Sequence, residues 1–325
     1  VLSLVGSEMC IRDRYTTRES MAMHAKGTSS IIQCGRRISD WEIGEIKETV
    51  GLCWRLSRYE LAQTIAENLG WYTASGSLKV DASVKLLEKL QSEGILRLPE
   101  KRGLSKPRSK RSIPITPRTA PAAEIDCKLK QLDFVELQVV SDPQDIKLWQ
   151  EYILRYHYLG YKKPFGYYLR YFIGSDRGIL GCVLFSGAAK SIGVRDRWIG
   201  WTQAQRLGNL AWVINNSRFL IFPWVKVANL ASHVFGQIHK QIRTHFKQRW
   251  GFCPVLMETF VDPQHHRGSC YKAANWGYLG MTTGCGLVRK GKSYRTSAKK
   301  IFVKPLVKEY RQLLCCEDLV MRGLI

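Results

Sequence analysis

The chain has 325 residues, enough for one large domain or two ordinary ones, and its 45% hydrophobic and 24% charged residues are typical of a protein with a buried core. This balance excludes wholesale disorder. The longest apolar runs are shorter than the roughly 18 residues that a membrane-spanning helix needs, so we expect no membrane contact. The 50 Lys and Arg against 27 Asp and Glu leave a net charge of +23, which predicts a polyanionic partner such as nucleic acid.

Cysteine usage favours a reducing compartment. The ten cysteines include no C-x-x-C pair, and the adjacent Cys315 and Cys316 cannot readily bridge to each other. The sequence therefore predicts neither a zinc ribbon nor a disulfide scaffold, and no metal site. A cytoplasmic location fits this pattern best.

The first 35 residues are expected to be an unstructured start. Within them, residues 3–14 (SLVGSEMCIRDR) are similar to the translated remnant of a sequencing adapter. They lack the basic start and the sustained apolar core of a signal peptide. We therefore expect the natural start to lie near Met21 or Met23.

Residues 36–100 predict a small helical domain. Ser57 and Glu60 have the spacing of a capping box, so a helix should begin there and run to about Asn68. An amphipathic stretch at 42–52 predicts an earlier helix. This domain should therefore contain at least two helices before its midpoint.

A further helix should begin with Asp81 as its N-cap and end at Gly94. A short strand at 95–99 and a basic turn follow it. Three helices, a strand and a basic turn in this order indicate a winged helix, in which the last helix enters the major groove of DNA. The polar side chains that this helix could present to DNA are Ser83, Lys85 and Lys89.

A second role for the winged helix stays open. Residues 36–100 contain nine basic and ten acidic residues, and Glu88 and Glu93 lie on the expected reading helix. Such a domain has little attraction for phosphates of its own. It could equally be a docking module for a protein partner.

Residues 101–123 predict an extended basic linker. The stretch 101–118 contains seven Lys or Arg, no Asp or Glu, and three prolines, so its charges repel one another and it has little to bury. It could contact phosphates or act only as a tether. The linker residues that we expect at DNA are Lys101, Arg102, Arg108, Lys110 and Arg111.

Residues 124–325 alternate between helical and strand patterns. The expected order is a helix (144–158), a hairpin (167–173 and 179–186), a strand (218–222), a long helix (225–249), a strand (255–261), a short helix (271–276) and a last strand (301–306). This layout is α/β with a mixed sheet. Its order of elements resembles the GNAT acyltransferase fold, so we expect a GNAT-like domain.

One feature argues against the acyl-CoA chemistry of GNAT enzymes. These enzymes hold a pyrophosphate on a glycine-rich turn at the start of the long helix. Here the corresponding residues 218–230 contain no glycine. The geometry between Phe222 and Asn229 should decide whether an anionic cofactor can bind there.

Four ordered segments carry a closer resemblance, to the DruA family. They are residues 215–221 (NNSRFLI), 229–232 (NLAS), 258–262 (ETFVD) and 268–276 (GSCYKAANW). The family is named after the Druantia anti-phage system, and its members also occur beside bacterial mobile elements. The resemblance implies a role in one of these settings, with DNA and other proteins of a defence system as partners. His265 and His266 depart from the family pattern.

Two carboxylates in an apolar strand are candidate catalytic residues. Glu258 and Asp262 could hold Mg²⁺ for phosphodiester cleavage, although residues four apart on a strand lie about 13 Å from each other. They could instead be structural, paired with Arg218 or capping the next turn. Tyr271, beside Cys270 at the start of a short helix, is a third candidate. Cofactors are otherwise unknown.

Aromatic and basic residues alternate at 156–170, a pattern that suits stacking on unpaired bases or the edge of a core. The sequence as a whole predicts a DNA-binding protein of anti-phage defence or of a mobile element. The alternative is an enzyme, either a metal-dependent nuclease or transposase or an acyltransferase derivative. Whether the protein is an enzyme stays open.

Overall fold

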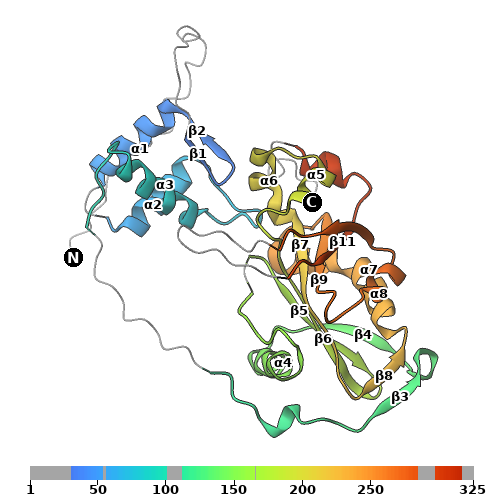
Figure 1. Ribbon diagram of the computed structural model, residues 1–325. Helices are drawn as coiled ribbons and strands as arrows, with labels where there is room; N and C mark the ends of the chain where they lie inside the picture. The colour runs from blue at the N-terminus through green and yellow to red at the C-terminus, as the bar shows by residue number, and fades with distance from the viewer. Residues whose placement is uncertain (1–30, 54–55, 101–111, 165, 285–296, 317–325) are drawn as a thin grey trace, which may run out of the picture.

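A computed structural model describes residues 31–53, 56–100, 112–164, 166–284 and 297–316. The described strands include a seven-stranded sheet with the order β10-β11-β9-β7-β6-β5-β4 (Figure 1). All neighbours in this sheet are antiparallel except β7 and β9, which are parallel. The strands are β4 (Val135–Val139), β5 (Leu169–Ser175), β6 (Gly178–Gly187), β7 (Val213–Ile221), β9 (Leu256–Val261), β10 (Gly277–Met281) and β11 (Lys300–Pro305).

The order of elements that the sequence predicts for this part of the chain is confirmed. The expected hairpin is formed by β5 and β6, which pair antiparallel. The strand, long helix, strand and short helix that follow are β7, α7 (Leu230–Trp250), β9 and α8 (Ser269–Ala273). The fold class is therefore mixed α/β, as expected.

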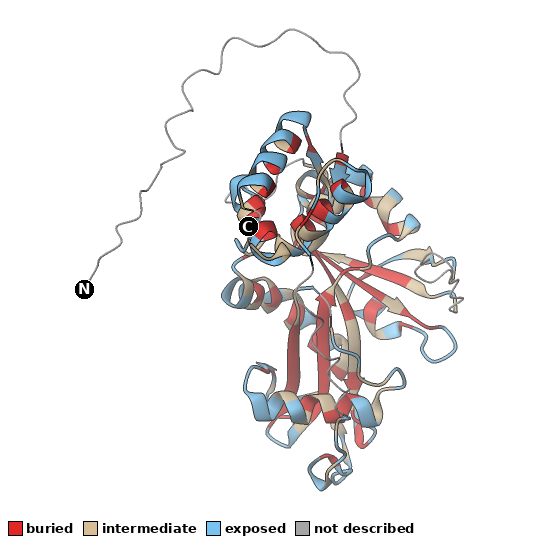
Figure 2. Cartoon of the chain, turned by 90° about the vertical axis from the view of Figure 1, so that its left-hand side faces the viewer, coloured by how far each residue is buried: buried red, intermediate tan, exposed pale blue. Residues whose placement is uncertain are grey.

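Helices cover both faces of the sheet. On one face lies α4 (Pro143–Tyr156), whose Tyr152 packs edge-on against Phe172 of β5 with ring centroids 6.5 Å apart. On the other face lies α7, whose His245 is 3.3 Å from the hydroxyl of Tyr171. Tyr171 and Phe172 are neighbours on one strand, so they point to opposite faces. Figure 2 shows the buried strands between helices whose outer sides are exposed.

The segment before α7 differs from the prediction of a helix beginning at residue 225. Val225–Ala228 is a strand, β8, which pairs in parallel with β3 (Ile125–Lys128). Valines at two positions favour the extended form, and Asn229 then turns the chain into α7 with a left-handed φ of 65°. The backbone ahead of the long helix is therefore engaged by another strand and is not an open, glycine-rich cradle.

The remaining helical elements of this α/β unit are short. They are α5 (Gly193–Ile199), α6 (Gln203–Asn209), α9 (Tyr310–Leu314) and the 3-10 helices η2 (Pro117–Thr119), η3 (Leu129–Gln131) and η4 (Leu210–Trp212). No helix in the described ranges combines the length and the apolar character needed to cross a membrane.

The end of the expected linker is fixed to the α/β unit. Glu151 of α4 is buried, and its carboxylate accepts hydrogen bonds from the hydroxyl of Thr119 at 2.6 Å and from the backbone N–H of Thr116. Burial alone would raise the pKa of Glu151, but these hydrogen bonds lower it below its usual value. The chain is therefore held to the α/β unit from Thr116 onward, within the range that the sequence predicts to be a linker.

The N-terminal unit (residues 31–100) is built from β1 (Ile31–Gln33), β2 (Arg36–Ile38), α1 (Asp40–Leu52), α2 (Arg58–Asn68) and α3 (Val80–Ser92). The capping box of Ser57 and Glu60 is confirmed, and Ser39 forms a second one with Glu42. This unit has a hydrophobic cluster of its own, separate from the core of the sheet. Fully buried members of the cluster include Leu61, Leu86 and Leu90.

Three local predictions for the N-terminal unit are wrong. Residues 95–99 form no strand: the backbone N–H of Leu98 donates to the side chain of Gln91 at 3.3 Å in place of a strand partner, and Leu98 packs against the helices. The third helix begins at Val80, after Lys79, so Asp81 is not its N-cap. The hairpin of β1 and β2 precedes α1, and β1 lies within the stretch that the sequence predicts to be unstructured.

Contacts between the N-terminal unit and the α/β unit include the β1–β2 turn and the α2–α3 turn. The β1–β2 turn places Gly35 against α6, where an added Cβ would lie 2.6 Å from the backbone nitrogen of Gly208 and 2.8 Å from the carbonyl carbon of Leu207. In the α2–α3 turn, the hydroxyl of Ser75 is 3.3 Å from that of Tyr167. Gly35 also has a φ of +83°, so both its conformation and its surroundings require glycine.

We expect Gly35→Ala to lower the free energy of unfolding by roughly 1–2 kcal/mol or more, through the left-handed φ and the clash with α6. Gly44→Ala is the matched control, because Gly44 lies inside α1 with nothing near its added Cβ. That substitution should stabilise by about 0.5–1 kcal/mol. Urea unfolding of both variants measures the difference, and equal effects would contradict the contact.

Candidate functional site

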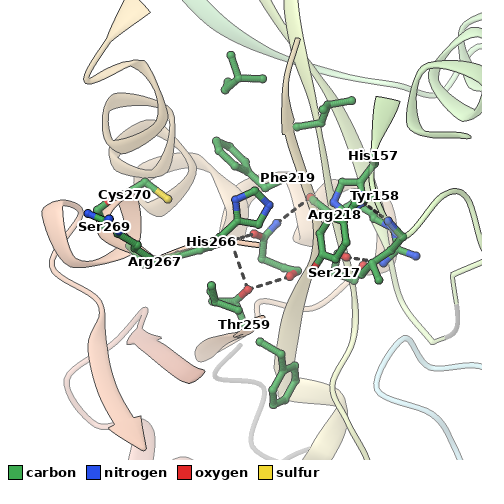
Figure 3. A pocket seen from close by; sticks show the side chains of 18 of the residues that line it. His157, Tyr158, Ser217, Arg218, Phe219, Thr259, His266, Arg267, Ser269 and Cys270 are labelled. Atoms are coloured by element: carbon green, nitrogen blue, oxygen red, sulfur yellow. Dashed lines mark hydrogen bonds between the residues drawn. The ribbon is translucent and has the colours of Figure 1, made fainter. Parts of the chain in front are cut away.

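A cavity of about 430 Å³ opens where the two parallel strands separate (Figure 3). β7 and β9 pair only over residues 213–216 and 256–259. Beyond this point β7 stays paired with β6, and β9 stays paired with β11. The strand edges that face each other are left open, and they form the two walls of the cavity.

The floor of the cavity is a small buried hydrogen-bond network. The hydroxyl of Tyr271 donates to Asn216 Oδ1 at 2.7 Å, and Thr259 Oγ1 lies 3.3 Å from the same hydroxyl. Asn216 Nδ2 in turn donates to the carbonyl of Leu184 at 3.2 Å. Burial raises the pKa of Tyr271, so its phenol stays protonated. Tyr271, predicted as a catalytic candidate, therefore holds the two strands together at the point where they part.

Arg218 lies on the β7 wall and has no carboxylate partner among the described residues. Its Nε donates to the carbonyl of Gly160 at 3.0 Å, and one terminal nitrogen donates to the carbonyl of Ser217 at 2.6 Å. Partial burial lowers the pKa of Arg218, because the guanidinium loses hydration without gaining a full counter-charge. An anion in the cavity would stabilise it.

Aromatic rings line the opening of the cavity. Tyr158 stacks on His157 with centroids 5.0 Å apart, and its other neighbours are His265 at 4.4 Å and His266 at 5.5 Å. Figure 3 shows Tyr158 and Arg218 on one wall and His266 on the other. The rings thus connect the segment after α4 with the loop after β9.

Electrostatically the cavity is positive. Its described lining contains two arginines, Arg218 and Arg267, two histidines, and no Asp or Glu. Burial, with the nearby charges of Arg218 and His266, lowers the pKa of His157 from 6.5 to about 4. Since Nδ1 of His157 accepts a hydrogen bond from the N–H of Leu159 at 3.2 Å, Nε2 carries the proton of the neutral ring.

Glu258 lies outside this cavity, in a buried ion pair. One of its oxygens is 2.7 Å from Arg195 Nη1, and the other accepts from the N–H of Ala189 at 2.9 Å. Both Glu258 and Arg195 are fully buried. Complete burial raises the pKa of Glu258, and the guanidinium beside it lowers it in part. The prediction that Glu258 pairs with Arg218 is therefore wrong, because the partner of Glu258 is Arg195 of α5.

The ion pair extends into a network that fixes α5 and α6 to β9. Asp196 accepts from Arg195 at 2.8 Å and from Arg206 of α6 at 3.1 Å. Burial opposes the charge of Arg195, but Glu258 and Asp196 together raise its pKa. Both oxygens of Glu258 have partners within the protein, so neither is free to bind a metal.

Asp262 follows the end of β9 and caps the next turn, as one interpretation of the sequence predicts. Its carboxylate accepts from the N–H of Gln264 at 3.1 Å and from the hydroxyl of Ser297 at 2.6 Å. These hydrogen bonds lower the pKa of Asp262. Within the described residues, no cluster of three or more His, Cys, Asp or Glu could hold a metal ion.

The predicted DNA-binding residues differ in their exposure to solvent. Ser83 is fully buried in the N-terminal unit, and its hydroxyl has no hydrogen-bond partner, so its predicted presentation to DNA is wrong. Lys85 is exposed on α3, and Lys89 is 3.9 Å from Glu93. The linker residues Lys101, Arg102, Arg108, Lys110 and Arg111 lie outside the described residues.

Three of the segments that carry the family resemblance meet at the cavity. They are residues 215–221 on β7, residues 258–262 on β9, and the start of 268–276 on α8. Sequence reasoning missed Arg218 and Thr259 as wall and floor residues, although both lie inside these segments. The signal that could have identified them is that Arg218 and Thr259 lie in two separate segments that carry the same family resemblance.

A family model described as Druantia protein DruA matches residues 89–291. The chain belongs to the DruA family. The matched range contains the whole cavity lining and more than half of the chain. No curated protein matches the sequence.

Solved structures similar to this DruA-family chain include acyl-transferring enzymes. A spermidine N-acetyltransferase from Vibrio cholerae is 9% identical with a TM-score of 0.33, covering 54% of this chain and 95% of its own. The N-acyl amino acid synthase FeeM from uncultured soil microbes is 12% identical with a TM-score of 0.33, covering 57% and 95%. An aminoglycoside acetyltransferase in complex with coenzyme A and kanamycin is 13% identical with a TM-score of 0.34, covering 55% and 98%.

We expect Glu258→Ala to lower the free energy of unfolding by about 3–5 kcal/mol, because it leaves Arg195 buried without its main partner. Replacing both residues, as Arg195→Met with Glu258→Leu, should recover part of this loss. Glu124→Ala, which removes an exposed ion pair with Lys226, should change stability little. Thermal unfolding compares the variants, and an unchanged stability of Glu258→Ala would contradict a structural role.

A pH dependence follows from His157. Its pKa is about 4 in the folded protein and near 6.5 when exposed, so the unfolded chain binds the extra proton between these values. Stability should therefore fall as the pH drops through this window. His157→Gln should make the fall shallower, whereas the same change at exposed His233 serves as a control. Identical pH profiles of the two variants in urea unfolding would contradict a neutral, buried His157.

Proposed function

We propose that this DruA-family protein binds DNA in anti-phage defence or as part of a mobile element, together with other proteins of the same system. The family supports the biological setting. The net charge of +23 supports a polyanionic partner, because such an excess repels itself in the absence of counter-charge.

The observation that carries the proposal is the charge of α7, the longest helix in the described residues. Its 21 residues include four Lys or Arg and no Asp or Glu. Lys240, Lys247 and Arg249 are exposed, and Lys240, Arg243 and Lys247 follow at i, i+3 and i+7 on one face. Within the described chain none of them forms an ion pair with a carboxylate. A basic helix face of this kind follows a phosphate backbone.

The N-terminal unit supplies a second candidate contact to DNA in this proposal. Three helices and the β1–β2 hairpin support its use as a DNA-binding module of the winged-helix type, with Lys85 and Lys89 on α3 as the candidate contacts. The seven cations at 101–118 of the sequence add to the attraction for phosphates.

Replacing Lys240, Lys247 and Arg249 together by Ala should weaken binding of the full chain to duplex DNA. The dependence of log affinity on log salt should become shallower by about 0.9 per lost phosphate contact, because fewer counterions are released. Gel shifts across a salt series measure both quantities.

The control is a variant with the same change in net charge, in which exposed Lys128, Lys130 and Lys226 around β3 and β8 become Ala. It should retain most of the affinity and the salt slope. If it matches the α7 variant, the charge of α7 has no special role. If the wild-type chain binds no DNA at low salt, the proposed function is wrong.

A further inference from the structure

We propose that the cavity between β7 and β9 holds one unpaired nucleotide of a DNA strand, with its phosphate at Arg218 and with Arg267 as a second contact to the strand's backbone at the edge of the cavity. This inference rests on the proposed function and specifies the ligand of the cavity. The charge of the site, its volume and the rings at its opening support this ligand.

The charge of the cavity favours an anionic ligand. Arg195 and Arg218 are both removed from water at least in part, but their hydrogen-bond partners differ in charge. Arg195 is fully buried and paired with Glu258 and Asp196 at 2.7 and 2.8 Å. Among the described residues, Arg218 has only the carbonyls of Gly160 and Ser217 as hydrogen-bond partners, and no carboxylate lines its cavity. A partly buried guanidinium without a counter-charge is costly unless a ligand provides one, and phosphate matches its geometry.

Arg267 provides the second cation, from the opposite wall. It lies in the loop after β9, is exposed, and borders the same cavity as Arg218. Its backbone carbonyl accepts from Lys300, so its position is held while its side chain stays available. Arg267 is therefore a second cation at the edge of the cavity, available to the phosphate backbone of a bound strand.

The interior suits a nucleobase. A volume of about 430 Å³ is within the range of small-ligand sites, and the lining combines apolar and aromatic side chains with a few polar groups. Asn216, Thr259 and Tyr271 on the floor donate their side-chain hydrogens within the protein, so they leave only oxygen lone pairs toward the cavity. Such oxygens can accept a hydrogen bond from an amino group on the edge of a base that has left the helical stack.

The rings at the opening suit the next base of the strand. Tyr158 is 42% exposed, and with His157, His265 and His266 it forms a cluster of rings beside the cavity. Bases stack on such surfaces with little regard to sequence, and each contributes about 1–3 kcal/mol. The alternation of aromatic and basic residues at 156–170 acquires a specific role in this arrangement.

The test uses the full chain and a short single-stranded oligonucleotide that contains one 2-aminopurine, a base whose fluorescence rises when it leaves the stack. We expect fluorescence to rise on binding. Arg218→Gln and Arg267→Gln should each lower the affinity for the single strand about tenfold and remove the rise, because each deletes one charged contact to phosphate. Affinity for the corresponding duplex should stay about the same.

Three variants make the result interpretable. Arg177→Gln, an exposed arginine in the β5–β6 turn, loses the same charge away from the cavity and should behave like the wild type. Arg218→Lys keeps a cation but not the planar guanidinium, and should lie between wild type and Arg218→Gln. Arg267→Gln removes no side-chain hydrogen bond of the described fold, so its effect stands even if Arg218→Gln is unstable in thermal unfolding.

The outcomes separate the two proposals. Equal losses for single strand and duplex, or no loss in either cavity variant, would overturn this inference. If the wild type binds duplex DNA but gives no 2-aminopurine response, the proposed function survives and the cavity inference fails. If 2-aminopurine deoxyribonucleoside monophosphate binds as tightly as the oligonucleotide, the ligand is a free nucleotide and the assignment to a DNA strand is wrong. Absence of any DNA binding overturns both.

Discussion

The separation of β7 from β9 is the constraint on which the rest of the α/β unit depends. Parallel neighbours cannot be joined by a tight turn, so the chain leaves β7, passes through β8 and α7, and returns as β9. This crossover sets α7 on one face of the sheet. After residues 216 and 259 each strand keeps its outer neighbour, so the cavity between them is held open by backbone hydrogen bonds on both sides.

Charge is distributed around this opening in two ways. On one side, Glu258, Arg195, Asp196 and Arg206 satisfy one another and attach α5 and α6 to the sheet. On the other side, Arg218 faces the cavity with carbonyl partners only. Buried ion pairs that satisfy their own hydrogen bonds stabilise a specific arrangement, whereas an unpaired cation in a cavity favours a ligand. The candidate catalytic Glu258 and the candidate partner Arg218 therefore belong to different parts of the molecule.

The network also connects the cavity with the N-terminal unit. Gly35 of the β1–β2 turn packs on α6, whose Arg206 binds Asp196, and Asp196 in turn binds Arg195 beside β9. A continuous set of contacts thus leads from the N-terminal helices to the strand that forms one wall of the cavity. In the proposed function, both ends of this path meet the same nucleic acid.

The sequence by itself determined the elements whose signals are local: the capping box at Ser57 and Glu60, the β5–β6 hairpin and the body of the long basic helix from Leu230 onward agree with spacing and residue type. It also supplied the segments that meet at the cavity. Only the tertiary structure decided that Arg195 pairs with Glu258, that Val225–Ala228 pairs with β3, and that Ser83 faces the core. The physical reason is that these outcomes depend on which groups, distant in the sequence, become neighbours in the fold. Those neighbours, and not the residues adjacent in the sequence, determine the energy of a buried charge or of an open strand edge.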